Sequence, residues 1–312
     1  TVRIERSTLP THPTAARRAA RLLATGDAAC PPGRYGLLVP EKYDPARPLV
    51  LLIHGLDSDS VMWGSMVNLL QADGHQVACF NYPDDGPIAD AGLLLADGLA
   101  DLRVKHPNAK PVMVIGHSMG GLVARHYVEG PAFRGDVDRL LMLGTPNSGS
   151  SWTGWRWATE WHSQYKTCQR EGNWTWSRLT DDGNGEAARD LQPGSEFLKS
   201  LNARPRREGV RYTVVAGDRN AVREVAADWV ACTANWFPER STRWWGFRHA
   251  HGGLVHKANE MRQTPAADDG PVTVESCKLP GVNDFVVVRA DHTGLVCGHP
   301  PAAWEVVRAR LR

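Results

Sequence analysis

Apolar and polar positions along the chain predict strands that alternate with helices. Short apolar runs rich in β-branched residues predict the strands, and the nearly unbroken run at 49–56 indicates a central parallel strand covered on both faces. The predicted strands are 1–6, 35–40, 49–56, 76–82, 111–115, 137–143, 210–217 and 284–288. The helical patterns are at 13–25, 62–70, 88–106, 122–128 and 302–311. This alternation predicts an α/β fold with a doubly wound, mostly parallel sheet.

Two segments interrupt the alternation, at about 147–209 and 218–268, and they hold ten of the twelve tryptophans. We expect one domain over 1–312, with these insertions forming a cap or lid over the carboxyl ends of the strands, where open α/β sheets bind ligands. Tryptophans of a small second core would give the same pattern. The candidate substrate-contacting residues are Trp152, Trp155, Trp244 and Trp245.

The composition argues against several classes of partner. The 312 residues include 36 basic and 34 acidic side chains, so no strong field favours nucleic acid or an anionic membrane. No run approaches the ~18 apolar residues of a transmembrane helix. The six cysteines, an even number, fit an oxidising compartment and show no zinc-finger spacing. We expect a secreted or periplasmic protein whose signal peptide is not in the printed sequence.

The cysteine positions suggest particular disulfides. Cys277 and Cys297 bracket the last predicted strand and the loop after it, so a bond between them would close a loop of about twenty residues, worth ~3 kcal/mol. Cys168 and Cys232 lie one in each insertion and would tie the insertions together. Cys79, in the predicted strand 76–82, is expected to be a buried thiol.

The most specific motif is Gly-His-Ser-Met-Gly at 116–120, between a predicted strand and a predicted helix. In such a turn the central residue, here Ser118, is held in a strained conformation, and the flanking glycines remove Cβ atoms that would clash. The hydroxyl then stands at a helix N-terminus, where backbone N–H groups favour developing negative charge. This pattern is typical of a serine nucleophile.

A serine nucleophile needs a base, an orienting acid and an oxyanion hole. His292 follows the last predicted strand and is the candidate base. Asp218 and Asp269 both stand where the acid could lie, and both also suit ordinary turns. His54-Gly55-Leu56 ends the central strand, and the glycine lets the Leu56 N–H point at a bound carbonyl oxygen. His249, His251 and His256 lie close together, as metal ligands often do, but no carboxylate or cysteine completes a ligand set with them.

Across about 35–311 the chain resembles the α/β-hydrolase superfamily, and within it bacterial triacylglycerol lipases and esterases. The motifs that carry the resemblance are 54–56, 116–121, the Gly-Thr-Pro-Asn-Ser-Gly of 144–149, the Leu-Gln-Pro-Gly-Ser of 191–195, Asp269-Gly270 with Val272 and Ser276, and Asp291-His292. The resemblance implies that Asp269, rather than Asp218, is the acid. It also implies that Leu56 and Met119 donate the oxyanion N–H groups. The acid that follows the histidine in calcium-binding lipases is replaced here by Thr293-Gly294, so no calcium site is carried over.

The resulting hypothesis is a serine carboxylic-ester hydrolase that acts without a cofactor on an ester or lipid substrate. Ser118, His292 and Asp269 form its catalytic triad, and contact with a lipid interface is expected. An acyltransferase would use the same triad and acyl-enzyme. A binding or effector protein with an inactive site is the non-enzymatic alternative.

Overall fold

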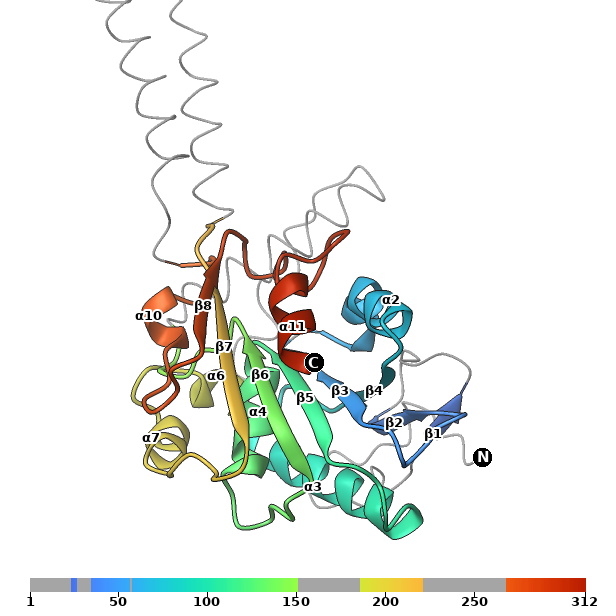
Figure 1. The fold of residues 1–312 in the computed structure, drawn as a ribbon. Coiled ribbons are helices and arrows are strands. Elements are labelled where there is room, and N and C mark those ends of the chain that lie inside the picture. The colour runs from blue at the N-terminus through green and yellow to red at the C-terminus, as the bar shows by residue number, and fades with distance from the viewer. Residues whose placement is uncertain (1–23, 27–34, 57, 151–185, 221–267) are drawn as a thin grey trace, which may run out of the picture.

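The computed structural model describes residues 24–26, 35–56, 58–150, 186–220 and 268–312. Within these residues eight strands form one sheet, in the order β1-β2-β4-β3-β5-β6-β7-β8 (Figure 1). The strands are β1 (Ala24–Gly26), β2 (Gly36–Pro40), β3 (Leu49–Ile53), β4 (Gln76–Asn81), β5 (Val112–His117), β6 (Val137–Leu143), β7 (Arg211–Gly217) and β8 (Phe285–Val288). Strand β2 pairs antiparallel with β4, and the pairs from β4 through β8 are parallel. The predicted mostly parallel sheet is therefore confirmed.

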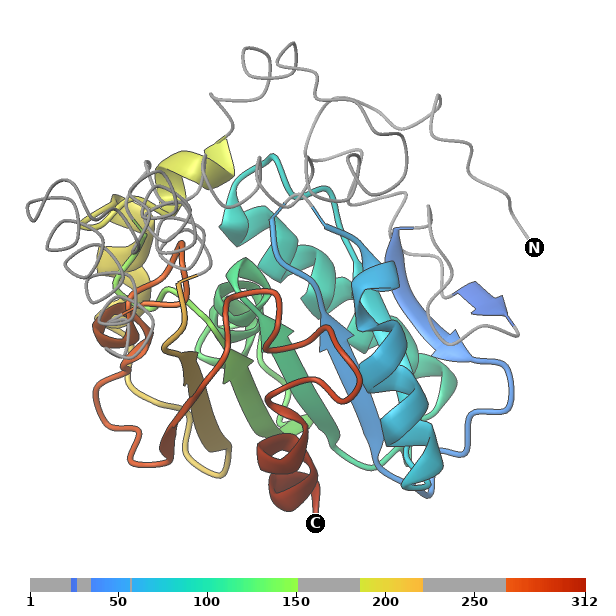
Figure 2. The same ribbon diagram turned by 90° about the horizontal axis from the view of Figure 1, so that it is seen from above.

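Helices cover both faces of the sheet, as Figure 2 shows from above. Helices α3 (Ile88–Lys105) and α4 (Met119–Val128) pack on one face, together with the short α6 (Glu186–Asp190), α7 (Glu196–Asn202) and α10 (Val274–Cys277). The 3-10 helix η2 (Ser60–Trp63), α2 (Gly64–Ala72) and α11 (Trp304–Leu311) pack on the other.

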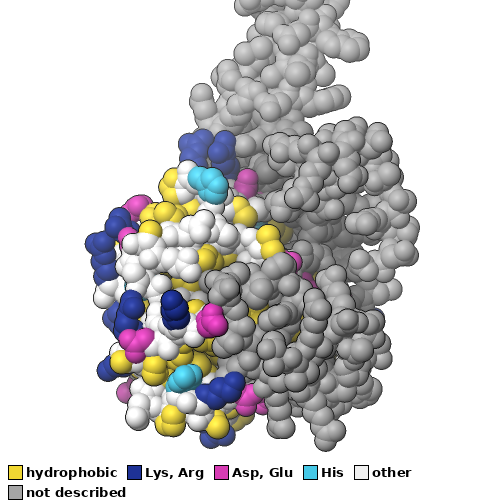
Figure 3. Space-filling model, turned by 90° about the vertical axis from the view of Figure 1, so that its right-hand side faces the viewer, with side chains coloured by type: hydrophobic (Ala, Val, Ile, Leu, Met, Phe, Trp, Pro, Cys, Tyr) yellow, Lys and Arg dark blue, Asp and Glu magenta, His cyan; other side chains and the backbone are white. Residues whose placement is uncertain are grey.

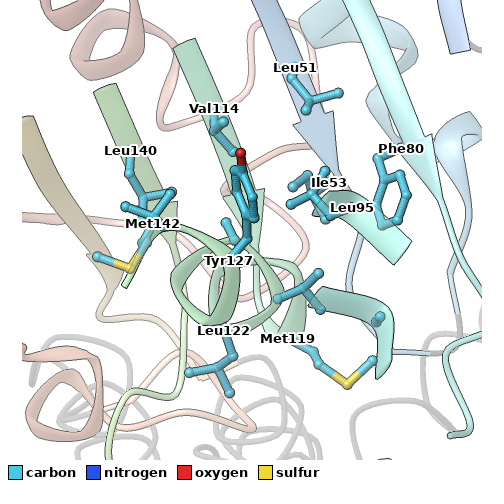
Figure 4. Packing of buried hydrophobic residues seen from close by; sticks show 14 of the residues in the cluster. Leu51, Ile53, Phe80, Leu95, Val114, Met119, Leu122, Tyr127, Leu140 and Met142 are labelled. Carbon is cyan, nitrogen blue, oxygen red and sulfur yellow. The ribbon is translucent and has the colours of Figure 1, made fainter. Parts of the chain in front are cut away.

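Strand β3 shows why the sequence forms this layered fold. All five of its residues are apolar and buried; Leu51 and Ile53 join the core on the α4 face, and Leu52 joins the core on the α2 face. Figure 4 shows the α4 face, where Val114 of β5 packs close to Tyr127 of α4. Burial on both sides allows an unbroken apolar strand, which an amphipathic sheet open to water would not.

The predicted elements agree with the structure in most places. Asp59 caps η2 by accepting a hydrogen bond from the Val61 N–H (2.9 Å), and the predicted helix at 62–70 continues as α2. The end of the predicted helix 13–25 is wrong, because Ala24–Gly26 pairs with β2 as strand β1. Tertiary pairing overrides local helix propensity there. The predicted strand 1–6 and the rest of 13–25 lie outside the described residues.

The last part of the segment predicted as the first insertion packs on the main core. Ala187 of α6 and Leu198 and Leu201 of α7 are buried in the same apolar cluster as α3 and α4. The remaining parts, 151–185 and 221–267, lie outside the described residues and follow β6 and β7 in the chain. The four candidate tryptophans, Cys168 and Cys232 fall in them.

The predicted Cys277–Cys297 disulfide is wrong. Cys277 is a buried free thiol in the core on the α4 face, whereas Cys297 packs against the core on the α2 face and lies 3.6 Å from Met62 O through its Sγ. The sheet separates them, and a disulfide requires Cα atoms within about 7 Å. Cys79 in β4, predicted as a thiol, is disulfide-bonded.

The surface of the described residues mixes charge types. In the view of Figure 3, basic, acidic and apolar side chains are interspersed rather than gathered by kind. This agrees with the nearly balanced charge of the chain. No helix in the described part of the chain is long and apolar enough to cross a membrane.

Candidate active site

Ser118 lies at the sharp turn between β5 and α4. It has φ 54° and ψ −127°, and it is the one non-glycine residue with positive φ in the described chain. A Cβ at Gly116 would lie 2.6 Å from Gly121 Cα, and one at Gly120 would lie 2.4 Å from the carbonyl oxygens of Ile53 and His54. The glycines therefore permit a close turn that seats α4 on the end of β3 and holds Ser118 in a strained conformation.

The loop after β3 lies against Ser118, since a Cβ at Gly55 would come within 2.9 Å of Ser118 Cβ. His54 Nδ1 donates a hydrogen bond to Gly55 O (2.8 Å), and the His54 ring stacks on Tyr82 at 4.4 Å between centroids. Burial lowers the pKa of His54 to about 4, so its imidazole is neutral near pH 7. In a trans peptide the C=O and N–H point in opposite directions, so this bond also fixes the direction of the Leu56 N–H.

His292 and Asp269 are joined directly. His292 Nδ1 lies 2.8 Å from Asp269 Oδ2, and the His292 backbone N–H donates to Asp269 O at 2.9 Å. The other carboxylate oxygen of Asp269 accepts the Val272 N–H at 3.0 Å. The Asp269 side chain is fully buried, and this burial raises its pKa, an effect that the nearby His292 opposes. The arrangement fixes the ring with Nδ1 as a donor and Nε2 as the nitrogen that can accept a proton.

His117, the neighbour of Ser118, links the turn to the loop that carries His292. Its Nε2 donates to His292 O at 2.9 Å, and the two rings lie 4.6 Å apart between centroids. Burial lowers the pKa of His117 well below its usual value, so it stays neutral and acts as a support. The Ser118 hydroxyl is buried and makes no hydrogen bond within the described residues. In ligand-free enzymes the bond between nucleophile and base is often long and tightens only with substrate.

The carboxyl end of β6 abuts the acid and the imidazole. Gly144 has φ 61°, and a Cβ there would lie 3.0 Å from His292 Nδ1 and 3.1 Å from Asp269 Oδ2. A side chain at this position would therefore displace the pair. The Gly-Thr-Pro loop that begins here is thus part of the wall of the site.

The structure brings together most of the residues that the sequence singled out. Ser118, Leu56 and Met119 lie at the carboxyl ends of β3 and β5, and the Asp269–His292 pair lies beside the end of β6. Asp218, the competing acid, follows β7, and its backbone N–H donates to Val288 O at 3.2 Å. Within the described residues no group of three or more potential metal-ligating side chains occurs.

Sequence reasoning missed the buried polar residues behind the site. Arg125 in α4 and Asn147 in the Gly-Thr-Pro loop are both nearly inaccessible and hydrogen-bond each other at 2.9 Å. A charged residue on an otherwise apolar helix was the available signal for Arg125. No local pattern predicted that Asn147 would be the partner of Arg125, because only the fold brings these two residues together.

The comparisons with known proteins agree with this fold. The sequence profile of the Alpha/beta hydrolase family matches residues 50–305, and the chain belongs to that family. Among solved structures it is similar to the mature form of the Bacillus licheniformis lipase BlEst2 (TM-score 0.57, 22% identity, 90% of this chain and 99% of that one). The propeptide form of that lipase is similar too (TM-score 0.57, 21% identity, 90% of this chain and 54% of that one).

A metagenomic carboxyl esterase, MGS0156, has a TM-score of 0.49 and 16% identity over 89% of this chain and 79% of that one. At 22% and 21% identity the likeness to the two lipase structures concerns the fold alone. No curated protein matches the sequence.

Proposed function

We propose that the protein is a serine carboxylic-ester hydrolase, a lipase or esterase that works through an acyl-enzyme on Ser118. His292 is the general base, and Asp269 holds the imidazole in the required tautomer. The observation that carries the proposal is the 2.8 Å bond from His292 Nδ1 to the buried Asp269 carboxylate, beside a serine with φ 54° at a strand-to-helix turn. Such a pair adjacent to a strained serine is the arrangement that activates a hydroxyl.

The reaction has two steps. Ser118 Oγ attacks the ester carbonyl carbon while His292 Nε2 takes the hydroxyl proton, and the imidazolium then gives that proton to the departing alcohol. Water attacks the resulting acyl-enzyme and loses a proton to His292, and the imidazolium then returns that proton to Ser118 Oγ as the acid is released. No step needs a cofactor.

The N–H groups of Leu56 and Met119 form the oxyanion hole in this proposal. Met119 is the first residue of α4, where N–H groups have no partner within the helix and the dipole favours negative charge. The bond from His54 to Gly55 O supports the role of Leu56, because it holds the peptide that carries the Leu56 N–H. One such donor contributes about a hundredfold or more to the rate.

Esters of medium or long acyl chains, including lipids, are the proposed substrates. The support is the predicted apolar cover formed by the tryptophans of the insertions, because tryptophan buries a large area and tolerates a wet edge. We also propose a secreted or periplasmic location. The disulfide at Cys79 supports it, since disulfides persist in oxidising compartments.

Labelling with a fluorophosphonate, combined with hydrolysis of p-nitrophenyl butyrate, tests the proposal. We expect label on Ser118 in the wild-type protein and none in Ser118→Ala, with hydrolysis lowered by several orders of magnitude in Ser118→Ala and His292→Ala. Retention of more than about a tenth of the wild-type rate by either folded variant contradicts the assigned roles. An unreactive wild-type protein indicates a binding protein, and a glyceride product formed with added glycerol indicates acyl transfer.

A further inference from the structure

Helix α4, which begins next to the proposed nucleophile, contains a fully buried guanidinium. Arg125 is 0% exposed and binds Glu129 through two hydrogen bonds, of 3.2 and 3.1 Å. Arg206 also approaches Glu129, at 3.0 Å. A buried ion pair of this kind is weak evidence for stability, because the cost of removing both charges from water offsets most of their attraction.

The remaining donors of Arg125 reach outside α4. Its Nη1 donates to Asn147 Oδ1 at 2.9 Å and to Asn202 Oδ1 at 3.0 Å. Asn147 in turn donates from Nδ2 to Cys277 O at 2.7 Å, and Asn147 O accepts from Asn202 Nδ2 at 2.8 Å. The amide of Asn147 thus bridges helix α4 and helix α10. Its side chain is almost completely buried, so water cannot replace these bonds.

The segments 144–150 and 269–277, which Asn147 joins, are held together along their length. Ser148 N–H donates to Ser276 O at 3.0 Å, the Ser276 hydroxyl donates to Gly149 O, and the Ser150 hydroxyl donates to Pro271 O. The segment 144–150 begins at Gly144, which lies against the His292 imidazole, and the segment 269–277 begins at Asp269. Displacement of either segment would therefore move the acid relative to the imidazole.

Resting on the proposed function, we infer that Asn147, seated on Arg125, is a positioning residue for the catalytic pair. It holds the turn that carries Asp269 at the position that gives the short bond to His292. Because α4 begins directly after Ser118, the same network connects the acid to the helix that presents the nucleophile. Errors of about an ångström in such geometry cost on the order of a hundredfold in rate.

Asn147→Ala and Asn147→Asp test this inference. Alanine removes both side-chain bonds, whereas aspartate keeps an acceptor for Arg125 and has no donor for Cys277 O. We expect kcat for p-nitrophenyl butyrate to fall about tenfold or more in both, with KM changed less than about threefold, because only the catalytic pair is disturbed. If only the alanine variant loses activity, the bond to Cys277 is not the positioning contact and the inference is overturned.

The pH profile separates positioning from general loss of structure. A less well placed Asp269 stabilises the imidazolium less, so the apparent pKa in kcat/KM against pH should fall in the Asn147 variants. Tyr127→Phe is the matched control, because it removes a buried 2.6 Å bond to Asp136 from the same helix. It should lower the melting temperature without changing the pH profile. An equal shift in the control overturns the inference.

A double-variant cycle gives the decisive result. If Asn147 acts through Asp269, Asn147→Ala lowers the rate of fluorophosphonate inactivation strongly in the wild-type background and little in the Asp269→Asn background. If Asn147→Ala lowers the inactivation rate by the same factor in both backgrounds, the inference is overturned and the proposed function stays intact. An unreactive wild-type protein overturns both, so the two failures are distinguishable.

Discussion

Replacing Asp269 by asparagine should abolish most activity while leaving the fold intact. The two carboxylate oxygens accept from the Val272 N–H at 3.0 Å and from His292 Nδ1 at 2.8 Å. An asparagine has one acceptor oxygen, and the backbone N–H cannot change its role, so the oxygen will face Val272. The amide NH₂ group then faces His292 and forces Nδ1 to become the acceptor. Nε2 consequently carries the hydrogen and cannot take the proton of Ser118.

The size of the effect follows from two contributions. A buried charge pair at about 4 Å and an effective dielectric of about 20 is worth ~4 kcal/mol, or roughly three decades of rate. The wrong tautomer raises the expected loss of kcat to about ten thousandfold. Because burial raises the pKa of Asp269 above its ordinary value of 3.8, ionisation of this carboxyl costs stability, and the cost accumulates as the pH rises from the ordinary value through the raised pKa. The uncharged amide should therefore keep the melting temperature close to the wild-type value.

Hydrolysis of p-nitrophenyl butyrate and thermal denaturation by circular dichroism measure the two effects. Asp218→Asn is the matched control, and we expect its kcat/KM to stay within about threefold of wild type, because Asp218 hydrogen-bonds Val288 O through its backbone. If Asp218→Asn is the more damaging variant, the acid is Asp218 and the tautomer argument is refuted.

Three further outcomes are expected. Gly144→Ala should lose both activity and about 1–2 kcal/mol of unfolding free energy, because φ 61° is unfavourable for alanine and the new Cβ would lie 3.0 Å from His292 Nδ1. Full activity of this variant would contradict the site geometry. The pKa of His54 is lowered to about 4, so His54 stabilises the fold above pH 6.5, and this contribution is lost as the pH falls from 6.5 towards 4. On acidification, the free energy of urea unfolding should therefore fall by about 3 kcal/mol less in His54→Gln than in the wild-type protein. An unchanged pH dependence would refute this. Specificity constants for p-nitrophenyl esters should rise from acetate towards longer chains, and a steady fall, unaltered by single alanine variants, would make the insertion tryptophans purely structural. Those variants are at Trp152, Trp155, Trp244 and Trp245.

Local features of the fold were predictable because they depend on neighbours in the chain. A short unbroken apolar run rich in β-branched residues favours a strand buried on both faces, and β3 and β5 are such strands. The turn at Ser118 was readable from the glycine pattern around the serine, and the clash that requires glycine at 116 is with the nearby Gly121. The clash that requires Gly120 is with the carbonyl oxygens of Ile53 and His54, which only the fold brings close. Long-range features were less accessible. The short strand β1 exists only because β2 offers it hydrogen bonds.

The disulfide prediction shows where sequence reasoning fails. Cys277 and Cys297 are close in the chain, yet strand β8 passes between them and they lie in the cores on opposite faces of the sheet. The network of Arg125 and Asn147 could not be predicted for a related reason. Its members come from different elements, and a buried guanidinium can be satisfied by any carbonyl or amide that the fold brings to it.

Apolar periodicity predicted the alternating α/β architecture, and the glycines around Ser118 predicted the strained serine turn, because both signals are patterns of residue types that lie close together in the chain. The packing of the sheet and its helices determines which acid contacts His292, which cysteines the sheet separates, and which asparagines bind the buried Arg125. Each of these contacts depends on the order of strands that are far apart in the chain and on the face of the sheet to which each side chain points. Hydrogen-bonding groups of the same kind are numerous along the sequence, and the packing of the sheet and its helices selects among them.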